Sequence, residues 1–142
     1  SKFQSLGEDH KVLEAWGAAT NQVALAMTLL EKASGREVVV ATTHLKARRG
    51  ALLTNIREQQ GGDRVTWVEG VREGRPVILT GDLNAPPSEP VLPLLTGSAV
   101  TPLRSSYASD QGESLSSNTG SHTDSLLLCD SLKVSCDKCV YD

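Results

Sequence analysis

The sequence of 142 residues lacks three features that would each assign it to a broad class. It has no apolar run of membrane-spanning length and no apolar core of a secretory signal peptide, so we expect a soluble, cytoplasmic protein, with a mitochondrial location as the alternative for a longer chain. It has no excess of positive charge, because its net charge is −3, which argues against a general nucleic-acid binder. Its three cysteines are an odd number, which argues against a closed disulfide framework.

What the sequence does contain is an apolar segment that ends in polar turn residues. Residues 76–80 run directly into Gly81, Asp82 and Asn84, a pattern typical of a buried strand that ends in a loop. A carboxylate and an amide at a strand end suit a Mg²⁺-assisted attack on phosphorus. Asp82 could hold the ion or orient a water, and Asn84 could donate to a phosphate oxygen. A purely structural Asx-turn is the alternative interpretation.

A second β-rich segment, residues 36–45, runs into the cationic side chains of His44, Lys46 and Arg48. If the extended conformation persists, these alternate positions share one face. An imidazole, an ammonium and a guanidinium on a common face make an anion site, in which Arg offers a fork to phosphate oxygens. The alternative is a solvated sheet edge. Because the cations are concentrated within an acidic chain, a small anionic ligand fits better than a long polyanion.

Turn residues divide the N-terminal half into two predicted strands. Residues 22–30 and 37–45 are predicted to form a β-hairpin, with residues 33–36 supplying the turn. The first 20 residues are weakly patterned, and we expect a loop there with a short helix near residues 12–16.

A helix and a further strand are predicted to follow the hairpin. Residues 51–72 are expected to be helical and residues 75–80 extended, and a strand–helix–strand order with a crossover this long favours neighbouring parallel strands. A short helix is expected from Ser88, a good N-cap, to about Leu95. This order of elements predicts the fold class α/β. The predicted buried stripe of the first helix consists of Leu52, Ile56, Val65, Val68 and Val71.

Four strings carry a resemblance to a known family: residues 21–26 (Asn-Gln-Val-Ala-Leu-Ala), residues 43–48 (Thr-His-Leu-Lys-Ala-Arg), Arg57-x-x-Gln60-Gly61, and residues 81–85 (Gly-Asp-Leu-Asn-Ala). In this order they resemble the nocturnin family of the exonuclease–endonuclease–phosphatase superfamily, which is similar to the carbon-catabolite-repressor deadenylases. The last string identifies only the superfamily, and the second points to the nocturnin family within it.

The resemblance extends over roughly residues 20–110 and implies a domain organisation. Residues 1–112 would be the central portion of a domain of this superfamily. Residues 113–142 would be a Ser-rich linker followed by a divergent tail. The α/β fold that the resemblance implies is part of a two-sheet β-sandwich flanked by helices, and half of a sandwich would leave one face of the hairpin without cover. The apolar positions expected to lose cover include Val23, Leu25 and Val39.

The resemblance implies a Mg²⁺-dependent phosphoester hydrolase that removes the 2′-phosphate of NADP(H). The alternatives are a poly(A) 3′-exoribonuclease and a truncated, non-catalytic fragment or binding module. In this interpretation His44, Asp82 and Asn84 are catalytic, and Asp82 and Asn84 also lie at the metal. Lys46 and Arg48 would neutralise the phosphates that are not transferred.

Two further residues enter through the resemblance. Arg57 would lie over the same pocket from the helix, with a structural salt bridge as the alternative. Residues 122–124 weakly resemble the superfamily's His-Thr-x-Asp-Tyr strand, which would place Asp124 where an Asp supports a catalytic His. The superfamily's metal-binding Glu and its terminal Ser-Asp-His motif have no counterpart in the sequence.

The tail also contains possible soft metal ligands. Cys136-x-x-Cys139, together with His122 and Cys129, could bind Zn²⁺, and the Cys pair alone could form a redox couple. The spacing fits no standard zinc finger, and reduced thiols without a structural role are the favoured interpretation.

Overall fold

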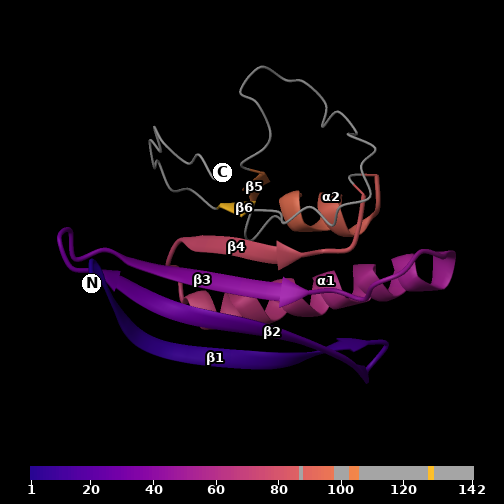
Figure 1. Ribbon diagram of the computed structural model, residues 1–142, viewed down its shortest axis with the longest axis horizontal. Coiled ribbons are helices and arrows are strands. Elements are labelled where there is room, and N and C mark those ends of the chain that lie inside the picture. Colours follow the sequence, from indigo (N-terminus) through magenta and orange to yellow (C-terminus); the bar gives the residue numbers. More distant parts are fainter. Residues whose placement is uncertain (87, 98–102, 106–127, 130–142) are drawn as a thin grey trace, which may run out of the picture.

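The computed structural model describes residues 1–86, 88–97, 103–105 and 128–129. In chain order the elements are β1 (Phe3–Ala15), β2 (Ala18–Glu31), β3 (Glu37–His44), α1 (Ala51–Arg72), β4 (Val77–Asp82), α2 (Val91–Thr96), β5 (Arg104–Ser105) and β6 (Leu128–Cys129). The strands form one mixed six-stranded sheet in the order β1-β2-β3-β4-β6-β5. The long helix α1 crosses one face of this sheet (Figure 1).

The strand pairing confirms the predicted α/β arrangement. β2 and β3 form the expected antiparallel hairpin, and β3 and β4 are parallel neighbours connected through α1. The parallel register pairs Val39 with Val77 at one end and His44 with Asp82 at the other. The two polar strand ends therefore meet at one edge of the sheet, as parallel pairing requires.

The first 15 residues form a strand, so the predicted loop with a helix near residues 12–16 is wrong. β1 pairs with β2 through a tight turn at Trp16 and Gly17, both of which have positive φ angles of 52° and 77°. Such a two-residue turn matches the twist of a hairpin. β1 is an edge strand in which only Leu13 and Ala15 are buried, so most of it lacks the apolar alternation that identifies a strand.

α1 has the predicted bounds but a different buried face. Of the predicted stripe only Val68 is buried, and Leu52 is 63% exposed. The residues that α1 buries are Arg57, Gln60, Gly61, Arg64 and Val68. The stripe prediction counted apolar side chains, whereas the N-terminal half of α1 faces a loop whose backbone groups need polar partners.

The second helix begins later than predicted. α2 starts at Val91, with no side-chain cap, and Ser88 is an exposed residue outside it. Glu89, which follows Ser88, instead bonds to a side chain of α1. None of the helices in the described ranges combines the length and the apolar character needed to cross a membrane.

The core lies between the sheet and the two helices. β3 and β4 contribute alternate residues to it, including Val39 and Leu79, and α2 adds Leu92 and Leu95. The prediction that Val39 loses cover is therefore wrong, because Val39 points toward α1 and is fully buried.

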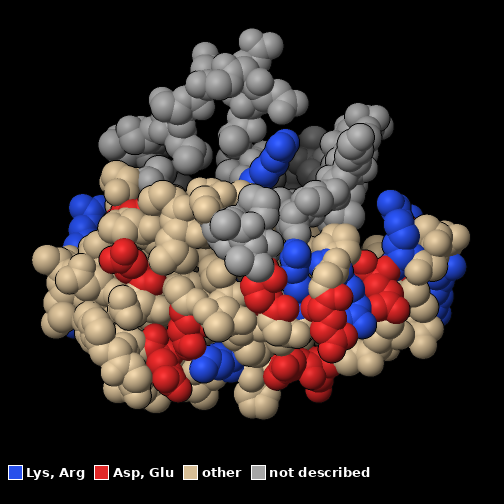
Figure 2. Space-filling view, turned by 180° about the vertical axis from the view of Figure 1, so that it is seen from behind, with Lys and Arg blue, Asp and Glu red and all other residues tan. Residues whose placement is uncertain are grey.

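On the molecular surface seen from behind, acidic and basic side chains are interspersed rather than separated by sign (Figure 2).

Candidate functional site

The ends of β3 and β4 bring His44 and Asp82 together on the sheet face opposite α1. Their Nε2 and Oδ2 atoms are 3.8 Å apart, and the side chains are 71% and 21% exposed. Gly81 permits this approach, because its φ is +123° and a Cβ there would overlap the carbonyl oxygen of Thr43. The glycine that precedes the aspartate is thus a requirement of the local packing.

Asp82 and Asn84 form a turn that also touches the neighbouring segment. The Asn84 backbone N–H donates to Asp82 Oδ1 at 2.8 Å, which is the Asx-turn of the alternative interpretation. The Asn84 side-chain amide donates to the Leu45 carbonyl at 2.9 Å, and Leu45 N–H donates to the Asp82 carbonyl at 2.9 Å. The turn uses one Asp82 carboxylate oxygen and one Asn84 amide hydrogen, and the other Asp82 oxygen faces His44.

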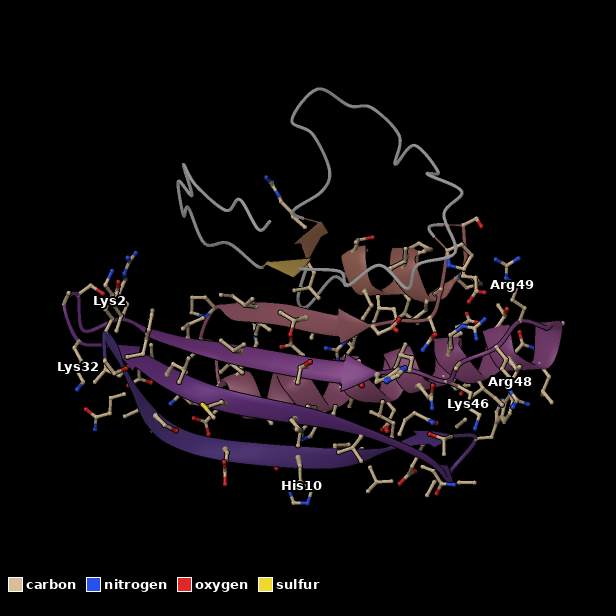
Figure 3. The ribbon with its side chains drawn as sticks, in the orientation of Figure 1. Lys2, His10, Lys32, Lys46, Arg48 and Arg49 are labelled. Atoms are coloured by element: carbon tan, nitrogen blue, oxygen red, sulfur yellow. The ribbon has the colours of Figure 1, made fainter. Side chains whose placement is uncertain are left out.

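Residues 45–50 between β3 and α1, here called the cation loop, carry Lys46, Arg48 and Arg49. The predicted common strand face for His44, Lys46 and Arg48 is wrong, because β3 ends at His44 and Arg48 has a φ of +78°. Lys46, Arg48 and Arg49 nevertheless gather where β3 ends and α1 begins (Figure 3). Within the described ranges the side chains of these three residues have no acidic partner.

Arg57 forms a structural salt bridge in the folded chain, which is the alternative to its predicted role in binding the substrate. Its side chain is fully buried, and its guanidinium pairs with Glu89 at 2.6 and 2.8 Å. The same guanidinium donates to the carbonyls of Lys46 and Arg48. Arg57 therefore holds the cation loop from behind and does not face the solvent-exposed side of that loop.

The described residues offer a metal ion one carboxylate at this site, that of Asp82. They contain no group of three His, Cys, Asp or Glu side chains that could hold a metal. Mg²⁺ commonly keeps several waters and uses one or two carboxylates together with substrate phosphates. Asp82 fits that partial role, and the described part of the chain does not form a complete metal site.

Several predicted site residues lie outside the description. Asp124 and the possible zinc ligands His122, Cys136 and Cys139 fall outside the described ranges. Cys129 lies in β6, opposite Ile78 of β4. The histidine-supporting aspartate therefore stays a prediction, and so does the interpretation of the cysteines as reduced thiols, with a zinc site as its alternative.

Sequence reasoning missed Gln60 and Glu89 as residues that build the site. Gln60 is fully buried and accepts the Lys46 backbone N–H at 3.0 Å, and Glu89 binds Arg57. Gln60 belongs to the family string at residues 57–61, but the string does not indicate that Gln60 binds the Lys46 backbone. For Glu89 the sequence offers no signal beyond its place after the expected N-cap Ser88.

Comparison with known proteins identifies relatives for most of the chain. Nocturnin of Drosophila melanogaster is 46% identical over 107 residues, which are 75% of this chain and 17% of that protein. The structure of the human nocturnin catalytic domain with a bound sulfate anion superposes with a TM-score of 0.80 and 33% identity, covering 92% of this chain and 49% of that one. No protein-family model matches the chain.

A more distant structure supports the fold alone. An endonuclease/exonuclease/phosphatase family protein from Bacteroides thetaiotaomicron is 17% identical with a TM-score of 0.68, covering 92% of this chain and 52% of that one. The chain therefore has the fold of this superfamily, but it spans only about a sixth of the length of the Drosophila relative.

Proposed function

We propose that this chain, a nocturnin homologue with the exonuclease–endonuclease–phosphatase fold, supplies the phosphate-binding part of a Mg²⁺-dependent phosphoester hydrolase. The substrate we propose is NADP(H), from which the 2′-phosphate is removed. The observation that carries the proposal is the meeting of His44 and Asp82 at one sheet edge, beside the cation loop.

Each side chain has a defined task in this reaction. A water attacks the phosphorus, the bond from phosphorus to the ribose 2′-oxygen breaks, and inorganic phosphate and NAD(H) are released. Asp82 orients the water or holds the ion, and a bound Mg²⁺ would neutralise charge on the phosphoryl oxygens. His44, whose side chain is largely exposed, donates to a phosphoryl oxygen.

The cation loop suits a compact ligand with several phosphates. Lys46 and Arg48 would bind the pyrophosphate, which is not cleaved, and the guanidinium of Arg48 can bind two of its oxygens. Their side chains are free to do so, because no acidic residue in the described part of the chain neutralises them. A localised group of cations on a chain with a net charge of −3 favours a dinucleotide over a long RNA.

Phosphate release from NADP⁺ tests the proposal in a nocturnin-type protein that contains this chain within a whole catalytic domain. We expect Mg²⁺-dependent release that Asp82→Ala abolishes while the circular dichroism spectrum stays unchanged. Asp9→Ala is the matched control, because Asp9 is an exposed carboxylate on edge strand β1. Release of AMP from poly(A), without phosphate release from NADP⁺, would replace this proposal with deadenylation.

A further inference from the structure

We infer that the buried pair of Arg57 and Glu89 is a positioning device that sets the cation loop relative to Asp82. This inference rests on the proposed function and adds residues that determine affinity without touching the substrate. All five N–H donors of Arg57 are engaged: Nε and Nη2 on Glu89, Nη2 also on Thr54, and Nη1 on the carbonyls of Lys46 and Arg48.

The loop backbone is bonded by α1 on both sides of Lys46. Gln60 Oε1 accepts the Lys46 N–H at 3.0 Å, and Arg57 Nη1 donates to the Lys46 carbonyl at 2.9 Å. Arg57 Nη1 also donates to the Arg48 carbonyl at 2.8 Å. Arg48 has a φ of +78°, a conformation that a residue with a side chain keeps only when its surroundings hold it. These bonds fix the direction in which Lys46 and Arg48 leave the backbone.

Glu89 connects this loop to the strand that carries Asp82. It lies before α2, in the segment that follows β4, and it binds both Nε and Nη2 of Arg57. Thr54 of α1 donates to the same carboxylate at 3.2 Å. A bidentate Arg–carboxylate pair fixes direction as well as distance. The position of the cation loop relative to Asp82 therefore depends on the Arg57–Glu89 pair.

Arg57 cannot itself bind the ligand without losing these hydrogen bonds. It is fully buried and has no unused donor, whereas Lys46, Arg48 and Arg49 extend from the loop without acidic partners in the described part of the chain. The polar face of α1 thus acts on the anion site through the loop backbone. Lysine at position 57 would keep the charge but could not bond to Glu89 and to both carbonyls together.

Binding of inorganic pyrophosphate to the full 142-residue chain, followed by ¹⁵N–¹H NMR, tests the inference. We compare the wild type with Arg57→Lys and with the double variant Arg57→Met/Glu89→Leu, which removes the buried ion pair altogether. The matched control is Arg75→Lys, because Arg75 also binds a carboxylate, that of Glu37, through Nε at 2.6 Å, but at the other end of β3. All spectra are recorded at a temperature where each variant is folded.

In both site variants we expect the pyrophosphate Kd to rise by about tenfold or more, because roughly one charge-assisted contact is lost. We also expect the Lys46 amide hydrogen to exchange faster. The control should leave both quantities unchanged. If either folded site variant keeps the wild-type Kd and the wild-type exchange rate, the positioning inference is overturned while the proposed function stands. If the wild type does not bind pyrophosphate, the anion site of the proposed function is refuted, and this inference with it.

Discussion

At the scale of single residues, two buried arginines on the same face of α1 have opposite surroundings. Arg57 has a partner for every donor, whereas Arg64 makes one long bond, from Nη2 to the Thr80 carbonyl at 3.4 Å. Within the described part of the chain, Arg64 Nε and Nη1 are buried without a partner. Burial alone lowers the pKa of the Arg64 guanidinium to about 9. A charge in this position costs stability, because the described residues offer it only this one long bond in place of its lost hydration.

Replacing each of these arginines with methionine should therefore change stability in opposite directions. Arg64→Met fills the same space with an apolar side chain and should raise the free energy of unfolding by about 1–4 kcal/mol. Arg57→Met leaves the Glu89 carboxylate and two loop carbonyls without their donor and should lower it by about 3–5 kcal/mol. Urea unfolding followed by circular dichroism measures both changes. Equal losses in the two variants would contradict this interpretation of Arg64.

The stabilisation by Arg64→Met should also depend on pH. Because the pKa of Arg64 is lower in the folded state, the unfolded chain binds more protons between about pH 9 and the ordinary pKa of arginine, and wild-type stability gains from rising pH in that window. Below about pH 9 both states are protonated and the cost of burial is present in full. The advantage of Arg64→Met should therefore be constant from pH 7 to 8.5 and shrink toward pH 10. A pH-independent difference in Tm would contradict this.

The sequence predicted the residues of the strand ends better than those that support them. His44 and Asp82 could be predicted to meet because parallel strands end at a common edge, and the register confirms that they do. A structural salt bridge of Arg57 was open as an alternative, but its partners could not be predicted, because they include two backbone carbonyls and a glutamate 32 residues away. Such partners become neighbours only when the chain is folded.

At the scale of elements, local signals located the long helix and the central hairpin but not the edge strand or the face that α1 buries. The ends of α1 agree with prediction because turn residues bracket the helix, with Gly50 before it and Glu73 and Gly74 after it. Its rotation depends on tertiary partners: Gly61 faces α2, where a Cβ would lie 2.6 Å from Val91 Cγ2. A glycine that lowers helix propensity therefore permits the close packing of the two helices.

Adding one methyl group at each of the adjacent glycines of α1 should separate packing from propensity. Gly61→Ala should lower the free energy of unfolding by about 1–3 kcal/mol, because Val91 must move. Gly62→Ala meets nothing within 4 Å and should raise it by up to about 1 kcal/mol through helix propensity. Thermal unfolding of the two variants in parallel tests this, and a gain in Gly61→Ala would contradict the helix contact.

At the scale of the whole molecule, the sheet is covered by α1 on one face, and the opposite face carries both the candidate site and exposed apolar side chains. These side chains are between 40% and 52% exposed and belong to Val12, Val23, Leu25 and Met27. The sequence predicted this exposure for Val23 and Leu25 from the half-sandwich expected of the family. A superposition that covers 49% of the human catalytic domain agrees with that expectation.

The 142-residue chain alone should be catalytically inert. Its described residues supply one carboxylate for a metal and no group of three metal-binding side chains. An under-liganded ion and the lack of a counterpart to the superfamily's terminal Ser-Asp-His motif, whose general acid–base help would contribute about 10²–10⁴-fold, each suppress turnover. Purified chain should release no Mg²⁺-dependent phosphate from NADP⁺ and no AMP from poly(A). Turnover on the order of 1–10³ s⁻¹ would show that the chain completes its site in another way.

The ends of β3 and β4, together with the cation loop, should bind the phosphates of NADP(H). Titration of the ¹⁵N-labelled chain with NADP⁺, and in parallel with NAD⁺, measures this binding. We expect saturable shifts of the amide signals of His44, Lys46, Arg48 and Asp82, with weaker binding of NAD⁺, which lacks the 2′-phosphate. Equal affinities for the two dinucleotides, or shifts confined to residues away from these strand ends, would contradict it.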